Sequence, residues 1–166
     1  MNIRRSRATL LLLIAALSGL VPTLAVHAQH DHQQGHRHDA SSAAVANLQL
    51  DGTKKWSTDA PLRSGMAAIR AAFDADHPAI HAGRETDAQY AALADRIASQ
   101  VDAIVASCKL PPQADANLHY VIADLMQGAS LMRGEDPQRT RHDGAALVHG
   151  ALDAYGRYFD DPGWKP

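Results

Sequence analysis

Residues 86–108 read TDAQYAALADRIASQVDAIVASC, and this stretch decides the fold of the chain. Apolar side chains recur in it every three or four residues, which is the period of a helix with one buried face. Thr86 and Gln89 have the spacing of an N-terminal capping box. The stretch therefore predicts a long amphipathic helix, whose buried stripe comprises Tyr90, Leu93, Ile97, Val101, Ile104, Val105 and Cys108.

Similar stripes lie on both sides of this helix. On the N-terminal side, Asp59 and Pro61 predict the start of a helix over residues 60–76. We expect that helix to end before Pro78, because a residue that precedes proline is pushed out of the α region; a separate short turn then follows as far as Gly83. On the C-terminal side, the Pro111-Pro112 pair predicts the start of a helix that runs to Met132, with Leu118, Ile122, Leu125, Ala129 and Met132 on its core face.

A fourth helix is expected after the polar loop of residues 135–142, with Asp143 as its cap and Phe159 near its end. No stretch of useful length alternates like a strand, and no repeat of fixed period occurs. Four amphipathic helices joined by short loops favour an all-α domain, an antiparallel up-down-up-down four-helix bundle over residues 49–166.

The first 28 residues have the pattern of a secretory signal peptide. Arg4, Arg5 and Arg7 precede the apolar run 10–20, and small residues at Val26 and Ala28 favour cleavage after Ala28. The run is shorter than the roughly 20 apolar residues of a membrane span. The sequence therefore predicts an exported protein that reaches the periplasm, with a mature chain that is not embedded in a membrane.

Residues 29–48, QHDHQQGHRHDASSAAVANL, form a histidine-rich tail that contains too few apolar side chains to build a core. We expect this tail to be disordered. Its two His-x-His pairs are flanked by carboxylates, a composition that chelates Cu(II), Ni(II) and Zn(II) through imidazole nitrogen. The candidate ligands are His30, His32, His36 and His38, and the alternative is a tail that serves solubility alone.

Charge and cysteine content narrow the classes of function. Removal of the signal peptide takes away three arginines and no acid, which leaves 13 basic and 18 acidic residues, a formal charge of -5. This balance excludes a nucleic-acid partner that is recruited by charge. Cys108 is the single cysteine, so the chain has no internal disulfide; the residue is a buried apolar group, a crosslink between chains or a soft metal ligand.

Two ends of the predicted bundle gather possible metal ligands. At one end His77 and His81 are four residues apart, and the topology brings His142 and His149 to the same end. Histidines at this spacing on a helix can chelate a metal ion, although His77 as a plain cap and His81 as a surface residue are the alternatives.

At the other end, Met66 and His119 fall in one layer, with Cys108 close by. These three side chains suit Cu(I), and a Met and His pair across a bundle suits haem b. The alternative is that Met66 belongs to the core and His119 to its flank. Covalent haem attachment is excluded, because the chain has no Cys-x-x-Cys-His motif. Phosphate loops, nucleophile elbows and His-Glu-x-x-His are absent too, so we do not expect an enzyme.

Four segments carry a resemblance to known proteins: KKWSTDAPLRSGMAAIR at 54–70, HPAIHAG at 77–83, SCKLPPQADANLHYVIADLMQGA at 107–129 and AYGRYFDDPGWKP at 154–166. In these segments the chain resembles a group of uncharacterised exported proteobacterial helical proteins, some of which are labelled DnrO-like. The resemblance implies a helical fold and an envelope location, and it brings no activity. In architecture the chain is also similar to the soluble periplasmic b-type cytochrome bundle, whose matching histidine belongs near the end of the fourth helix, where this chain has Tyr155, Gly156 and Tyr158.

Three functions follow as hypotheses. The first is an envelope protein that binds or buffers Cu, Ni or Zn through its tail and bundle histidines. The second is an electron carrier that holds haem b between Met66 and His119. The third is an envelope interaction protein without a cofactor, for which the sequence identifies no protein partner.

Overall fold

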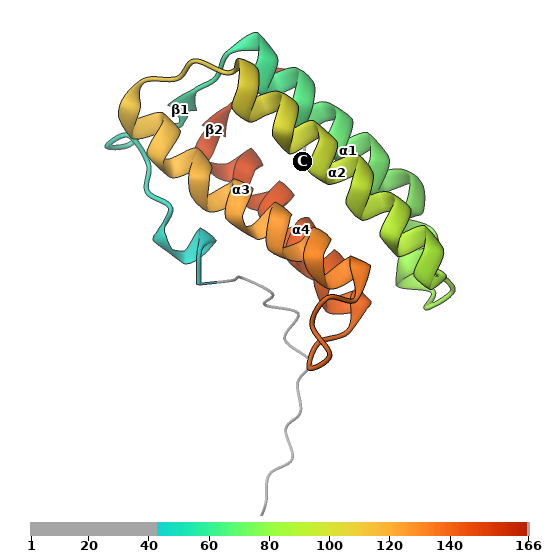
Figure 1. The fold of residues 1–166 in the computed structure, drawn as a ribbon. Coiled ribbons are helices and arrows are strands. Elements are labelled where there is room, and N and C mark those ends of the chain that lie inside the picture. The colour runs from blue at the N-terminus through green and yellow to red at the C-terminus, as the bar shows by residue number, and fades with distance from the viewer. Residues whose placement is uncertain (1–42, 166) are drawn as a thin grey trace, which may run out of the picture. The chain divides into compact units, whose positions relative to one another are not determined.

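The computed structural model describes residues 43–165 of the chain. It shows four α-helices, a short 3₁₀ helix η1 and two strands of two residues each (Figure 1). Their bounds are η1 Val45–Asn47, β1 Trp56–Ser57, α1 Ala60–His81, α2 Asp87–Ser107, α3 Pro112–Arg133, α4 Arg141–Tyr158 and β2 Phe159–Asp160. The predicted all-α class with four helices is confirmed.

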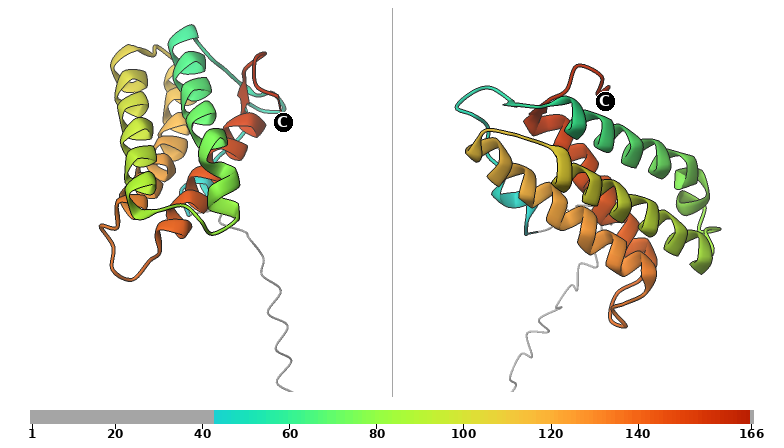
Figure 2. Two further views of the ribbon diagram at one scale, coloured as in Figure 1. Left: turned by 90° about the vertical axis from the view of Figure 1, so that its right-hand side faces the viewer. Right: turned by 45° about the horizontal axis from the view of Figure 1, so that its top comes forward.

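Consecutive helices run in opposite directions and lie side by side (Figures 1 and 2). Helix α1 packs on α2, α2 on α3, and α3 on α4, whereas α1 and α4 touch far less. The core between the helices is apolar, and Leu62, Met66, Ile69, Leu93 and Leu125 in it are fully buried. The bundle is therefore well packed on three of its seams and more open along the fourth.

Helix α1 is longer than the sequence predicts, because it continues through Pro78 to His81. A proline inside a helix removes one hydrogen bond, here the bond to the carbonyl of Asp74, whose residue is exposed. Ile80, the penultimate residue of the helix, is 4% exposed and anchors the last turn in the core. Burial of this side chain and access of water to the Asp74 residue explain why the helix does not stop at His77.

The N-terminal cap of α2 is the residue that the sequence predicts, whereas the cap of α4 is a different residue. Thr86 and Gln89 form the predicted capping box. In α4, however, the cap is Thr140, whose hydroxyl accepts a hydrogen bond from the Asp143 N–H at 3.1 Å. Asp143 is the third residue of that helix and accepts in return from the Thr140 N–H at 2.8 Å. This reciprocal pair explains why α4 starts at Arg141, two residues before Asp143.

Two predicted core positions lie nearer the surface than expected. Val105 is 61% exposed, and Ile122 is only partly buried. On α3 the buried face includes Val121, which was not predicted, and it includes Gly128 next to the predicted Ala129. A Cβ at Gly128 would lie 2.7 Å from the carbonyl oxygen of Gly144 on α4, so these two glycines allow the α3 and α4 backbones to approach closely.

The segments outside the helices close one end of the bundle. Strands β1 and β2 pair in parallel, which the sequence did not predict because each is only two residues long. The last part of the predicted disordered tail is ordered: Val45 and Leu48, three residues apart, are buried in the core cluster. The Gln49 N–H also donates to Asn117 Oδ1 of α3 at 3.0 Å, so the folded domain begins before residue 49.

The predicted signal peptide and residues 29–42 of the tail lie outside the described residues. Within residues 43–165, no helix combines the length and the apolar character that a membrane crossing requires.

Candidate functional site

The open seam between α1 and α4 forms a groove of about 990 Å³. Small residues of α4 line one wall, among them Ala145, Ala146 and Gly150. Longer side chains of α1 and the C-terminal Trp164 line the other wall. The volume is that of a ligand-binding cleft, and the space exists because small side chains on α4 do not reach across to α1.

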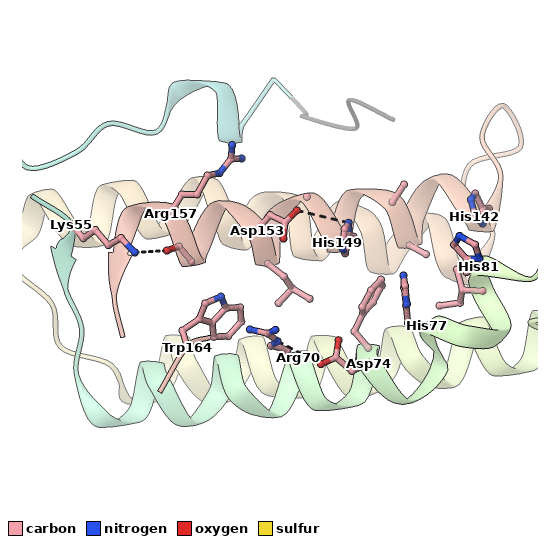
Figure 3. Close-up of a pocket in the computed structure, with 17 residues that line it drawn as sticks. Lys55, Arg70, Asp74, His77, His81, His142, His149, Asp153, Arg157 and Trp164 are labelled. Atoms are coloured by element: carbon pink, nitrogen blue, oxygen red, sulfur yellow. Dashed lines mark hydrogen bonds and ion pairs between the residues drawn. The ribbon is translucent and has the colours of Figure 1, made fainter. Parts of the chain in front are cut away.

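One end of the groove gathers aromatic and imidazole rings from both helices. His77 of α1 lies 5.9 Å from His149 of α4 and 6.1 Å from His81, measured between ring centroids. Phe73 lies beneath both His77 and His149, with its centroid 5.7 Å and 5.8 Å from theirs. His142 lines the same end of the groove, where Figure 3 shows it together with His81. The structure thus brings together the four histidines that the topology assigns to one end.

These distances bear directly on metal binding. Metal–nitrogen bonds of about 2.0–2.1 Å hold the centres of two coordinating imidazoles roughly 5–6 Å apart. The His77 pairs with His81 and His149 have comparable centroid distances. The planes of His77 and His149 are only 19° apart, however, so their in-plane nitrogen lone pairs do not converge on one point. In the part of the chain that the structure describes, no three His, Cys, Asp or Glu side chains are placed to hold an ion together.

A shared ion therefore requires at least one imidazole to rotate. His77 is exposed, and the side chain of His149 is 56% exposed, so neither ring is locked by packing. Rotamer changes of exposed side chains are fast, on the order of picoseconds to nanoseconds. Asp153 lies one turn after His149, with its carboxylate 4.0 Å from His149 Nδ1 (Figure 3). A carboxylate in this position favours an Nδ1–H tautomer and leaves Nε2 as the free donor for a metal.

The other end of the groove is cationic and aromatic. The Arg70 guanidinium carbon lies 4.8 Å from the centroid of the Trp164 ring. Arg70 Nε pairs with Asp74 at 3.5 Å, and its Nη1 donates to the Lys165 carbonyl. Trp164 also packs edge-on against Tyr155, with ring centroids 4.8 Å apart. Contacts on several sides thus hold the Arg70 side chain in place beside the indole.

The ligands predicted at the opposite end of the bundle do not form a common site. Met66 is fully buried in the core, whereas the side chain of His119 is 64% exposed on α3 and lies 3.6 Å from Asp115. Cys108 is half-buried at the end of α2, and burial raises the pKa of its thiol, with the nearby Asp59 and Asp115 carboxylates adding to the shift. A raised pKa disfavours the thiolate that a metal needs. Neither Met66 nor His119 lines the groove between α1 and α4.

The four tail histidines, His30, His32, His36 and His38, lie outside the described residues. No protein-family model, curated protein or solved structure matches the chain. What the protein does must therefore be inferred from its own side chains.

Sequence reasoning missed the cationic end of the groove. Neither Arg70 nor Trp164 is among the candidate site residues that the sequence identifies. Trp56 is buried in β1 and donates to the Gln49 carbonyl at 2.6 Å, while Trp164 lies in the groove. The signal available was the turn Asp161-Pro162-Gly163, which reverses the chain after α4 and lays Trp164 back over Gly156.

Proposed function

We propose that this chain is an exported protein of the bacterial envelope that binds or buffers Cu, Ni or Zn through histidine side chains. The observation that carries the proposal is that His77, His81 and His149 lie close together at one end of the α1–α4 groove, which His142 also lines. Neutral imidazole is a ligand that all three metals accept. The signal-peptide pattern and the periplasmic location that it implies are part of the same proposal.

In this proposal the two groups of histidines have different properties. The tail offers four imidazoles in nine residues, a composition that favours capacity over selectivity. The groove offers imidazoles fixed to two helices, so less conformational entropy is lost when they bind an ion. The tail therefore collects metal, and the groove provides the tighter site.

The groove site is tested in a full-length chain whose four tail histidines are replaced by asparagine. Calorimetric titration with Cu(II), Ni(II) or Zn(II) should show residual binding, and His77→Ala or His149→Ala should each weaken it by about tenfold or more, the effect of losing one ligand. The matched control is His119→Ala, which removes an exposed imidazole on α3 outside the groove. Residual binding that His119→Ala weakens as much as His149→Ala does would remove the groove from the proposal.

The tail is tested by comparing that asparagine variant with the unaltered chain. The unaltered chain should bind additional equivalents of metal at lower affinity. Equal stoichiometry in the two proteins would show that the tail binds nothing and would contradict its role as a collector.

A further inference from the structure

The groove is far larger than a metal ion needs. An ion with six water molecules occupies roughly 200 Å³, since each water takes about 30 Å³. The groove measures about 990 Å³, which is in the range of clefts that bind organic ligands. A bare ion at the histidine end would thus leave most of the groove filled with solvent.

The side chains at the histidine end, as they are placed, also do not complete a coordination shell on their own. Cu(II), Ni(II) and Zn(II) bind four or more donor atoms. His77, His81, His142 and His149 offer one imidazole each, but within residues 43–165 no three of them are placed to hold one ion. With two imidazoles on an ion, the remaining positions face the groove and are open to ligands that come with the metal.

Arg70 provides an anion-binding group within reach of those positions. It precedes His77 by seven residues on α1, two helical turns or about 10 Å along the groove. Its Nε and Nη1 atoms have the partners Asp74 and Lys165, while its Nη2 amino group has no hydrogen-bond partner in the described part of the chain. A guanidinium that its neighbours hold in place loses little entropy when it binds a carboxylate, and its hydrogen bonds to that group are charge-assisted.

We propose that the groove binds its metal as a complex with a small polycarboxylate, with the metal at His77 and His149 and a free carboxylate at Arg70 beside Trp164. This inference rests on the proposed function, because it names the form in which that site takes its metal. The Trp164 indole, over which the Arg70 guanidinium lies, borders the carbon skeleton of the acid, and the groove length from Arg70 to His77 sets the size of the complex.

The probe is nickel citrate, titrated calorimetrically into the full-length chain with asparagine at the four tail positions. Ni(II) in a non-coordinating buffer and citrate alone are titrated in parallel. The nickel citrate complex should bind about tenfold more tightly than Ni(II), which corresponds to one additional charge-assisted contact. Arg70→Gln should abolish this difference and leave the affinity for Ni(II) unchanged.

Arg157→Gln is the matched control. Arg157 also lines the groove, but Figure 3 shows its guanidinium directed away from Arg70 and Trp164. This variant should bind nickel citrate and Ni(II) as the parent does. Thermal unfolding of both variants verifies that the fold is retained.

The outcomes separate the two proposals. Equal affinity for Ni(II) and nickel citrate, or equal effects of Arg70→Gln and Arg157→Gln, overturns the polycarboxylate inference and leaves metal binding intact. Tight binding of citrate alone also overturns it, because the metal is then unnecessary. Failure of both Ni(II) and nickel citrate to bind removes the groove metal site as well.

Discussion

The His77 imidazole on α1 and the His149 imidazole on α4 lie 5.9 Å apart across a seam where these two helices otherwise make few contacts. Phe73 supports both rings from below and is itself only 2% exposed. The geometry of the histidine end is therefore set by a buried phenylalanine rather than by hydrogen bonds between the imidazoles. This arrangement keeps the two rings close together and leaves each free to turn.

Phe73→Ala should be strongly destabilising. Removal of a buried aromatic ring lowers the free energy of unfolding by about 3–5 kcal/mol, because the transfer free energy of the ring is lost and a cavity is left. Phe73→Leu retains most of the apolar volume and should cost less. Chemical denaturation of the two variants measures both values, and a Phe73→Ala cost below that of Phe73→Leu would contradict the supporting role of this ring.

Gly144→Ala should lower the free energy of unfolding by about 1–3 kcal/mol, the usual effect of overpacking. The new Cβ would lie 2.5 Å from the Gly128 carbonyl oxygen and 2.8 Å from the Met132 nitrogen, both of which are backbone atoms that cannot move alone. Gln127 of α3 is exposed and supplies a control, since Gln127→Ala adds no side chain between the two helices. A Gly144→Ala protein as stable as Gln127→Ala would show that α3 and α4 are not in close backbone contact.

Glu85 should make the stability depend on pH. Both carboxylate oxygens are shielded from solvent and have no hydrogen-bond partner in the described residues. Desolvation raises the pKa of Glu85, the Asp76 carboxylate raises it further, and Arg96 partly opposes the shift. A carboxyl group whose pKa is raised in the folded state destabilises the fold when it is ionised. This destabilisation is absent below the unfolded-state pKa of about 4.3, and it develops as the pH rises through the folded-state pKa.

Glu85→Gln should therefore raise the melting temperature at neutral pH and change it little near pH 4. Thermal unfolding of the parent and the variant across this range measures the difference. A gain that is larger at acidic than at neutral pH would reverse the expected sign and would refute the desolvation of Glu85.

The helices could be predicted from the sequence because periodicity and caps are local signals. The stripe from Tyr90 to Ile104 and the Thr86 capping box fix α2 without tertiary information. The end of α1 could not be predicted, because the penalty at Pro78 is offset by burial of Ile80 in a core that exists only after folding. At this helix end the local cost of a proline competes with the burial of Ile80, and the burial prevails.

The histidine end of the groove could be anticipated from topology, since up-down connections place His77 and His149 at one end. The groove itself could not, because its width depends on how small residues such as Ala146 and Gly150 meet α1 in three dimensions. The same holds for the contact of Arg70 with Trp164, which are separated by most of the folded domain in sequence. Long-range contacts of this kind leave no periodic signal.

Elemental analysis of untagged protein, purified from cells grown with added copper, nickel and zinc, is the simplest test of the proposal that this protein holds a metal ion with its imidazoles. We expect bound copper, nickel or zinc, and a melting temperature that rises when the metal-free protein is given the same ion, because binding to the folded state stabilises it. Protein that emerges without metal, and whose melting temperature is unchanged by all three ions, would contradict the claim.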